Sequence, residues 1–323
     1  MTLSSNISCS EPLTYYGSHR HVTPTPVRLP GTDCTINPEV PLANYTSFRV
    51  GGPAQWYVAP HRWEEVLESF DWAKSQDLPI THLGAGSNLL VCDRGIPGLV
   101  LSTRHLRHSE FDAESGRITA GAGEPIARLA WQAAKRGWQG LEWAVGIPGT
   151  MGGSVVMNAG AHSRCIADAL VNALVLLPDG TIQELKGEDL EYQYRTSALQ
   201  GSDRLVLQAT LQLQPGATRS QVMAETNRNL QQRKTSQPYH LPSCGSVFRN
   251  PQTQAAGWLI EQIGLKGYQI GGAQVAHRHA NFILNCGGAQ AMDIFNLIQH
   301  VQEQVERHWS LSLQPEVKLL GEF

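Results

Sequence analysis

Three polar residues, far apart along the chain, stand in short segments that could do acid–base or electrostatic chemistry. Arg195 lies in the segment Tyr-Arg-Thr-Ser, Ser246 follows a glycine in residues 245–251, and Glu316 lies near the C-terminus in Pro-Glu-Val-Lys. An arginine can bond a carboxylate bidentately, and a hydroxyl or a protonated carboxyl group can donate a proton. A single arginine is usually a solvated ion-pair former, so these residue types alone do not identify a reaction.

Two glycine-rich segments could hold a phosphate-bearing cofactor. The first is LGAGSNLL (residues 83–90), directly after a predicted strand, and the second is GIPGTMGGS (residues 146–154). Glycine lets a ligand approach the backbone closely, and exposed backbone N–H groups bind pyrophosphate. Neither segment has the spacing of a Rossmann dinucleotide turn or of a P-loop. Two such segments in one domain favour a cofactor site of another kind over two ordinary tight turns.

The composition limits the class of protein. The chain has 323 residues, of which 41% are hydrophobic and 16% charged, with a net charge of −3. These values are typical of a soluble globular enzyme or binding protein and give no electrostatic footprint for nucleic acid. The six cysteines are scattered without a C-x-x-C pair, and His277 and His279 lack a third ligand at a recognisable spacing, so we predict free thiols and no metal site.

The ends and apolar runs of the chain bear on its location. The first residues lack the cationic start and apolar stretch of a signal peptide, and no apolar run approaches the roughly 20 residues that span a bilayer. We therefore expect a cytoplasmic protein without membrane insertion, and a monomer by default.

Alternating helix and strand patterns predict a mixed α/β domain over residues 39–215. Strands are expected at 55–58, 78–83, 99–102, 118–120 and 205–213, helices at 63–75 and 125–136, and a hairpin around the Pro-Asp-Gly turn at 178–180. Residues 1–38 are rich in Ser, Thr and Pro, which predicts a flexible N-terminal extension. A short strand that caps the first domain is the alternative for this extension.

A second, smaller α+β domain is expected over residues 216–323. Pro215 and Gly216 mark the boundary between the two domains. Helices are expected at 221–233, 254–263 and 291–309, and the last of them carries its apolar residues on one face. Short strands are expected at 270–272, 281–285 and 316–320.

Taken in chain order, these segments resemble the UDP-N-acetylenolpyruvoylglucosamine reductases, the MurB family. The matching stretches are residues 44–54, 83–90, 140–161, 194–197, 245–251, 265–272 and 315–318. The resemblance implies a two-part FAD-binding domain of the p-cresol methylhydroxylase/vanillyl-alcohol oxidase type, followed by an α+β substrate-binding domain. The short interval between Arg195 and Ser246, with Gln237 where one subgroup has lysine, indicates the shorter subgroup without an extra lid module.

The resemblance also implies a reaction. Members pass a hydride from NADPH to FAD and then to an enolpyruvyl ether on a nucleotide sugar, which gives UDP-N-acetylmuramate for peptidoglycan synthesis and so serves cell shape and division. By position, Arg195 and Glu316 would stabilise the enolate-like intermediate, and Ser246 would protonate it.

Further residues are assigned by the same resemblance. The cofactor-binding residues would be Gly84, Gly86, Ser87, Asn88, Gly149, Gly152, Gly153, Ser154 and Asn158, and the substrate-binding residues Tyr194, Arg249 and Asn250. Two other readings stay open. One is an oxidase of the same flavin superfamily that acts on another small alcohol. The other is a nucleotide-sugar-binding protein with an inactive site, against which the presence of Arg195, Ser246 and Glu316 together argues.

Overall fold

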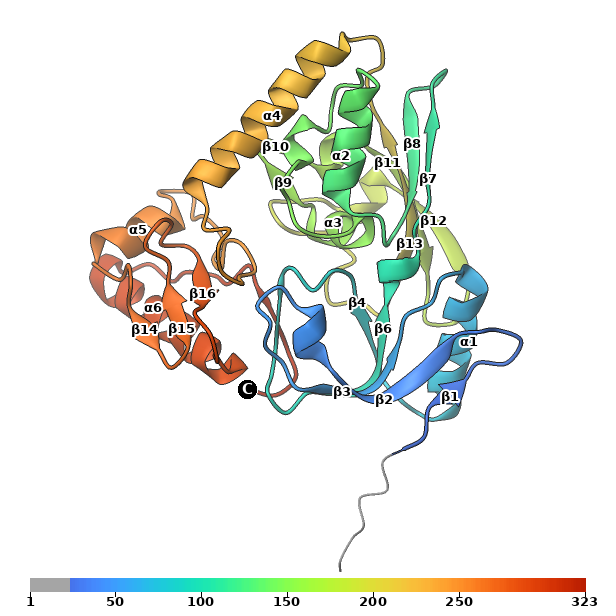
Figure 1. The fold of residues 1–323 in the computed structure, drawn as a ribbon, viewed down its shortest axis with the longest axis horizontal. Coiled ribbons are helices and arrows are strands. Elements are labelled where there is room, and N and C mark those ends of the chain that lie inside the picture. Colours follow the sequence, from blue (N-terminus) through green and yellow to red (C-terminus); the bar gives the residue numbers. More distant parts are fainter. Residues whose placement is uncertain (1–23) are drawn as a thin grey trace, which may run out of the picture.

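The computed structural model, which describes residues 24–323, contains two five-stranded sheets (Figure 1). The first sheet has the order β1-β2-β3-β6-β4, built from Val27–Arg28, Thr35–Pro41, Pro53–Val58, Ile96–Ser102 and Ile80–Leu83. The second has the order β12-β11-β13-β8-β7, built from Ile182–Lys186, Leu170–Leu176, Leu205–Gln212, Arg117–Gly121 and Ser109–Asp112.

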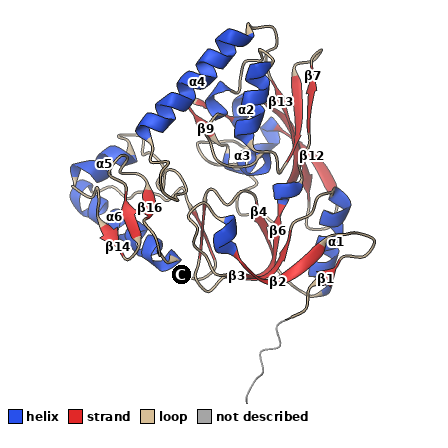
Figure 2. Ribbon diagram, viewed as in Figure 1, coloured by secondary structure: helices blue, strands red, loops and turns tan. Residues whose placement is uncertain are grey.

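Helices cover both sheets and give the layered α/β arrangement that the sequence predicts (Figure 2). In the first sheet, β3 and β4 each pair in parallel with β6, and α1 (Trp63–Ser75) makes the crossover from β3 to β4. The second sheet is antiparallel, and α2 (Ile126–Lys135) and α3 (Met151–Met157) lie on one face of it. The long helix α4 (Arg219–Ser236) packs against α2.

Short elements connect these layers. The 3-10 helices are η1 (Leu42–Tyr45), η2 (Thr103–His105), η3 (Glu142–Ala144), η4 (Ile166–Asp168) and η5 (Gly187–Leu190). A small hairpin pairs β9 (Gly160–Ala161) with β10 (Arg164–Cys165).

The C-terminal part is a three-stranded antiparallel sheet with two helices, as expected for an α+β domain. The strands are β14 (Gln269–Ile270), β15 (Ala273–Val275) and β16 (Ile283–Asn285), and the helices are α5 (Ala256–Gln262) and α6 (Ala291–Trp309). The last strand, β17 (Lys318–Leu320), leaves this sheet and pairs in parallel with β5 (Leu89–Val91). Because β5 begins within the first glycine-rich segment, this pairing brings the C-terminal Pro-Glu-Val-Lys motif next to that segment.

The prediction of a flexible extension over residues 1–38 is wrong for residues 27–38. Strands β1 and β2 form a hairpin, and β2 pairs with β3, so a boundary at residue 38 would cut β2. Leu29, Cys34 and Ile36 are buried in the core beneath α1. These apolar residues outweigh the Ser, Thr and Pro around them, and the alternative of a capping strand describes the segment. Residues 1–23 lie outside the described part of the chain.

Helix α3 is an element that sequence patterns miss. Its sequence, MGGSVVM, has two glycines and therefore poor intrinsic helix propensity. Met151 and Val155 are fully buried in the core of the second sheet, and the Thr150 side chain caps the helix by accepting a hydrogen bond from the Gly153 N–H. Tertiary packing therefore overrides local propensity here.

No helix within residues 24–323 is long and apolar enough to cross a membrane.

Candidate active site

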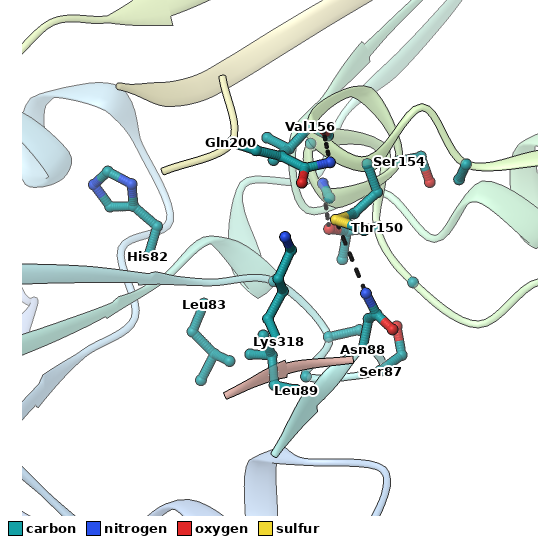
Figure 3. Close-up of a pocket in the computed structure, with 18 of the residues that line it drawn as sticks. His82, Leu83, Ser87, Asn88, Leu89, Thr150, Ser154, Val156, Gln200 and Lys318 are labelled. Atoms are coloured by element: carbon teal, nitrogen blue, oxygen red, sulfur yellow. Dashed lines mark hydrogen bonds between the residues drawn. The ribbon is translucent and has the colours of Figure 1, made fainter. Parts of the chain in front are cut away.

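A cavity of about 650 Å³ lies where the two sheets and the C-terminal part meet (Figure 3). Its walls come from both glycine-rich segments, the end of β4, the loop between Arg195 and β13, the loop at residues 244–246, and β17. The volume falls within the range of small-molecule and cofactor sites. The cavity therefore gathers every segment to which the sequence assigned chemistry.

The two glycine-rich segments face each other across one side of this cavity. The Ser87 hydroxyl donates a hydrogen bond to the Pro148 carbonyl at 3.1 Å, which ties the two segments together. A Cβ atom at Gly86, where φ is +64°, would lie 2.0 Å from the Tyr45 carbonyl oxygen. This turn therefore requires glycine at position 86. The turn directs Ser87 and Asn88 to the cavity (Figure 3).

Eight of the predicted cofactor-binding residues line the cavity. They are Gly84, Gly86, Ser87, Asn88, Gly149, Gly152, Gly153 and Ser154. Gly153 is exposed to the cavity, and the nearest heavy atom to an added Cβ there is Thr150 Oγ1 at 3.6 Å. The protein itself therefore leaves space in front of this backbone, as a cofactor cradle requires.

The three predicted catalytic residues meet on the cavity wall. Arg195 Nε donates to Glu316 Oε1 at 2.8 Å, and the two side chains are only 20% and 16% exposed. Ser246 lines the same cavity from the loop that follows α4. Glu316 is held against the glycine segment because the Asn88 side chain donates to its carbonyl at 3.0 Å. A fixed cation, a carboxyl group and a hydroxyl therefore face one space.

Burial sets the protonation behaviour of this group. Removal from water raises the pKa of the Glu316 carboxyl above its ordinary value, although the adjacent Arg195 charge acts in the opposite direction. Two residues further along the chain, burial lowers the pKa of Lys318, and the positive charge of Arg249 adds to this effect. The site can therefore hold a proton on a carboxyl group beside a permanent positive charge.

The backbone of Arg195 is in the left-handed region, with φ at +57°, and neighbouring side chains hold it there. Arg249 Nη2 and Gln200 Nε2 both donate to the Arg195 carbonyl, at 3.1 and 2.8 Å. Arg195 Nη2 donates to the Gly160 carbonyl at 2.8 Å. These bonds fix the backbone and the guanidinium group of Arg195. In this structure Arg249 therefore supports Arg195 and does not itself face the cavity.

Some predicted site residues do not line the cavity; they are Asn158, Tyr194, Arg249 and Asn250. Asn158 is buried, donates to the Gln193 carbonyl at 2.9 Å and accepts from the Ala167 N–H at 3.1 Å. Asn250 accepts from the Ala256 N–H at the start of α5. In this structure Asn158 and Asn250 therefore each hold local backbone, and their contact with cofactor or substrate stays a prediction.

The cavity wall also contains side chains that the sequence analysis did not assign: His82, Gln200 and Lys318 (Figure 3). Lys318 belongs to the same Pro-Glu-Val-Lys motif as Glu316 and begins β17, so its place in the motif was the signal available in the sequence. His82 precedes the first glycine segment on β4, and nothing in its local sequence separates it from a core histidine.

Within residues 24–323, no group of three His, Cys, Asp or Glu side chains could hold a metal ion.

Comparison with known proteins shows to which family this architecture belongs. The UDP-N-acetylenolpyruvoylglucosamine reductase of Trichormus variabilis is 62% identical over 297 residues, which cover 92% of this chain and 90% of that protein. The enzyme of the same name from Synechocystis sp. is 59% identical over 307 residues, covering 93% and 97%. The chain belongs to the UDP-N-acetylenolpyruvoylglucosamine reductase family.

Matches to family models and to a solved structure agree with membership of the reductase family. The model described as the C-terminal domain of UDP-N-acetylenolpyruvoylglucosamine reductase matches residues 237–320, and the FAD binding domain model matches residues 54–186. The crystal structure of the reductase from Thermus caldophilus covers 89% of this chain and 100% of its own, with a TM-score of 0.78 and 34% identity. The predicted fold class, an FAD-binding domain followed by an α+β domain, is confirmed.

Gly153→Ala tests the cofactor cradle. We expect FAD affinity to fall by at least about tenfold, or about 1.4 kcal/mol, because the new methyl group occupies the space in front of α3. The fold should persist, since no protein atom lies within 3.4 Å of the new Cβ and alanine favours a helix. Fluorescence titration of the apoprotein with FAD and a thermal melt of the apoprotein measure the two effects.

Gly152→Ala is the matched control for Gly153→Ala. Its Cβ would lie 2.9 Å from the Ala122 Cβ in the core, so we expect the apoprotein to lose stability. Wild-type FAD affinity in Gly153→Ala would show that the cofactor does not approach this part of α3.

Proposed function

We propose that the chain reduces the enolpyruvyl ether of UDP-N-acetylenolpyruvoylglucosamine with NADPH, through bound FAD, and forms UDP-N-acetylmuramate for peptidoglycan precursor synthesis. The observation that carries this proposal is the Arg195–Glu316 pair with Ser246 on the wall of a cavity whose other wall is the glycine cradle of an FAD-binding domain. Family membership indicates the substrate class, and the geometry supports a separate role for each of the three residues.

FAD fits the residues of this cavity. Gly153 leaves its backbone open on the cavity side, whereas Gly84 and Gly149 line the cavity where the Thr150 and Ser87 hydroxyls approach them closely. Ser87 and Asn88 add short polar groups suited to a pyrophosphate. When bound, FAD supplies hydride transfer between NADPH and the methylene carbon of the enolpyruvyl group. The chain must then stabilise the negative charge that develops on the neighbouring carbon and its carboxylate, and must protonate that carbon.

Arg195 stabilises this developing charge. Its guanidinium is partly buried and oriented by bonds to Glu316 and Gly160, so it does not have to reorganise when the charge forms. Glu316 assists when it is protonated, because a neutral carboxyl group can donate a hydrogen bond to an enolate oxygen. Because burial raises its pKa, Glu316 is easier to protonate than an exposed glutamate.

Ser246 delivers the proton to the substrate carbon. A serine hydroxyl is a weak acid, so it can serve only against a strongly basic carbanion held close to it. Gly245, with φ at +85° and no heavy atom within 4 Å of an added Cβ, leaves open space beside the hydroxyl. Tyr194, which is 52% exposed and whose ring centre lies 5.0 Å from the Arg195 guanidinium carbon, remains a candidate substrate contact at the edge of this space.

We further infer a cytoplasmic enzyme. The cysteines of the described chain, Cys34, Cys92, Cys165, Cys244 and Cys286, are all free thiols. Free thiols without disulfides support a reducing compartment.

The proposed function is tested by product analysis with the FAD-reconstituted protein. Incubation with NADPH and UDP-N-acetylenolpyruvoylglucosamine without dioxygen should give UDP-N-acetylmuramate, two hydrogens heavier by mass spectrometry, with one NADPH consumed for each product formed. A protein that binds FAD and the substrate without forming this product would instead be a nucleotide-sugar-binding protein. Rapid reoxidation of the reduced protein by dioxygen alone would favour the oxidase alternative.

A further inference from the structure

The His82 side chain stands in the cavity wall with an unsatisfied ring nitrogen. Its Nε2 atom is buried and has no hydrogen-bond partner within residues 24–323, and one face of the ring stacks on Phe70 at a centroid distance of 5.9 Å. A buried polar atom without a partner destabilises the fold, so a histidine used only for packing is a poor choice at this position. The side chain retains some exposed surface, and it lines the cavity.

His82 lies at the end of the cavity away from the Arg195–Glu316 pair. On one wall, the chain runs from His82 through the glycine segment to Asn88, which bonds to Glu316. On the other wall, it runs from Arg195 past Gln200 to the start of β13. Figure 3 shows His82 well apart from Asn88 and Lys318.

The two ends of the cavity suit different parts of FAD. The reacting ring must lie near Arg195, Ser246 and Glu316, because these residues carry the chemistry of the proposed function. The glycine segments lie between that end and His82, where they suit the pyrophosphate. The adenosine half of the cofactor is therefore the part left to extend toward His82.

The environment of His82 suits a neutral partner. Burial lowers the pKa of the imidazole to about 4, against a smaller opposing effect of the exposed Asp203, which is the charged group that faces it. Near neutral pH the ring therefore carries one N–H donor and one acceptor nitrogen. This pattern matches the edge of an adenine base or a ribose hydroxyl better than it matches a phosphate.

We propose that His82 hydrogen-bonds the adenosine half of FAD and so makes the site select FAD over FMN. FMN shares the ring system and one phosphate with FAD but has no adenosine. The contact with His82 should thus contribute to the affinity for FAD and not to the affinity for FMN. This inference rests on the FAD site of the proposed function, but it concerns binding and not turnover.

Titration of the apoprotein with FAD and with FMN, followed by flavin fluorescence, tests this selection. We expect His82→Leu to weaken FAD binding by about tenfold or more, the size of one lost hydrogen bond to a buried group, and to leave FMN binding within about twofold of wild type. His82→Gln keeps an uncharged donor and acceptor and should retain more FAD affinity than His82→Leu. His108→Leu, an exposed histidine of the same domain, is the control and should change neither affinity.

Three results would overturn the proposal. They are unchanged FAD affinity in His82→Leu, an equal loss for FAD and FMN, and equal FAD affinities for His82→Leu and His82→Gln. An equal loss for both flavins would assign His82 a purely structural role, and a thermal melt of the apoprotein would show it as lost stability. Failure of the wild-type protein to bind FAD at all would count against the proposed function, and so is distinguishable from failure of this inference.

Discussion

Ser246→Ala is expected to slow the transfer of reducing equivalents to the enolpyruvyl substrate by about 10²–10⁴-fold, the usual contribution of a positioned proton donor. Reduction of the flavin by NADPH should stay within about twofold of wild type, because no proton from Ser246 is needed in that half-reaction. Within residues 24–323 the removed hydroxyl makes no hydrogen bond that holds the loop, so the fold should be unaffected. Stopped-flow absorbance under anaerobic conditions measures the two half-reactions separately.

Ser243→Ala is the matched control for Ser246→Ala. Ser243 is half-buried in the same loop but does not line the cavity, so both of its half-reactions should match those of wild type. Unchanged rates for both half-reactions in Ser246→Ala would show that another group protonates the substrate carbon.

Arg195→Ala is expected to slow the same half-reaction by about 10²–10³-fold, because it removes a preorganised charge from the place where the enolate develops. Arg195→Lys should recover only part of this loss, since an ammonium is a point charge that cannot reproduce the two directed bonds to Glu316 and Gly160. Equal rates in Arg195→Lys and wild type would show that charge alone matters and that the orientation of the guanidinium does not.

The Arg195→Ala variant should also change how stability depends on pH. The pKa of Glu316 is already raised in the folded protein, and loss of the Arg195 charge should raise it further. As pH rises from the ordinary pKa of a glutamate to this raised pKa, the unfolded chain ionises first, so the free energy of unfolding should fall more in the variant than in wild type. Urea unfolding at several pH values measures this difference, and Glu316→Gln in the same background should abolish it.

Sequence patterns identify the candidate catalytic residues of this protein better than the contacts that hold those residues in place. Arg195, Ser246 and Glu316 each stand in a recognisable segment, and all three line the cavity. The bond between Arg195 and Glu316 could not be predicted, since it depends on the parallel pairing of β17 with β5. Pairing between strands so distant in the chain leaves no local periodicity in the sequence.

The same limit applies to the side-chain amides of Asn158 and Asn250. The resemblance assigns Asn158 and Asn250 to the site, but a short polar side chain can serve a ligand or its own backbone equally well. Only the packed structure shows that the Asn158 amide bonds to the Gln193 carbonyl and that Asn250 caps the start of α5. Both asparagines lie near the site because they hold the backbone of segments beside it.

The position of the domain boundary depends on contacts that a local sequence signal does not carry. Pro215 and Gly216 end the second sheet, but the next helix, α4, packs back on α2, and Leu230 of α4 lies against the core of that sheet. The family model of the C-terminal domain begins at residue 237, just after α4. We propose that the structural boundary follows α4, because a Pro-Gly pair marks the end of a strand and carries no information on which core the next helix joins.

Anaerobic stopped-flow spectroscopy of the FAD-loaded wild-type protein tests most directly whether the cavity performs the proposed reduction. We expect NADPH to bleach the flavin absorbance and UDP-N-acetylenolpyruvoylglucosamine then to restore it in the absence of dioxygen, with one equivalent of UDP-N-acetylmuramate formed. Flavin absorbance that stays bleached with this substrate and returns only when dioxygen is admitted would contradict this expectation.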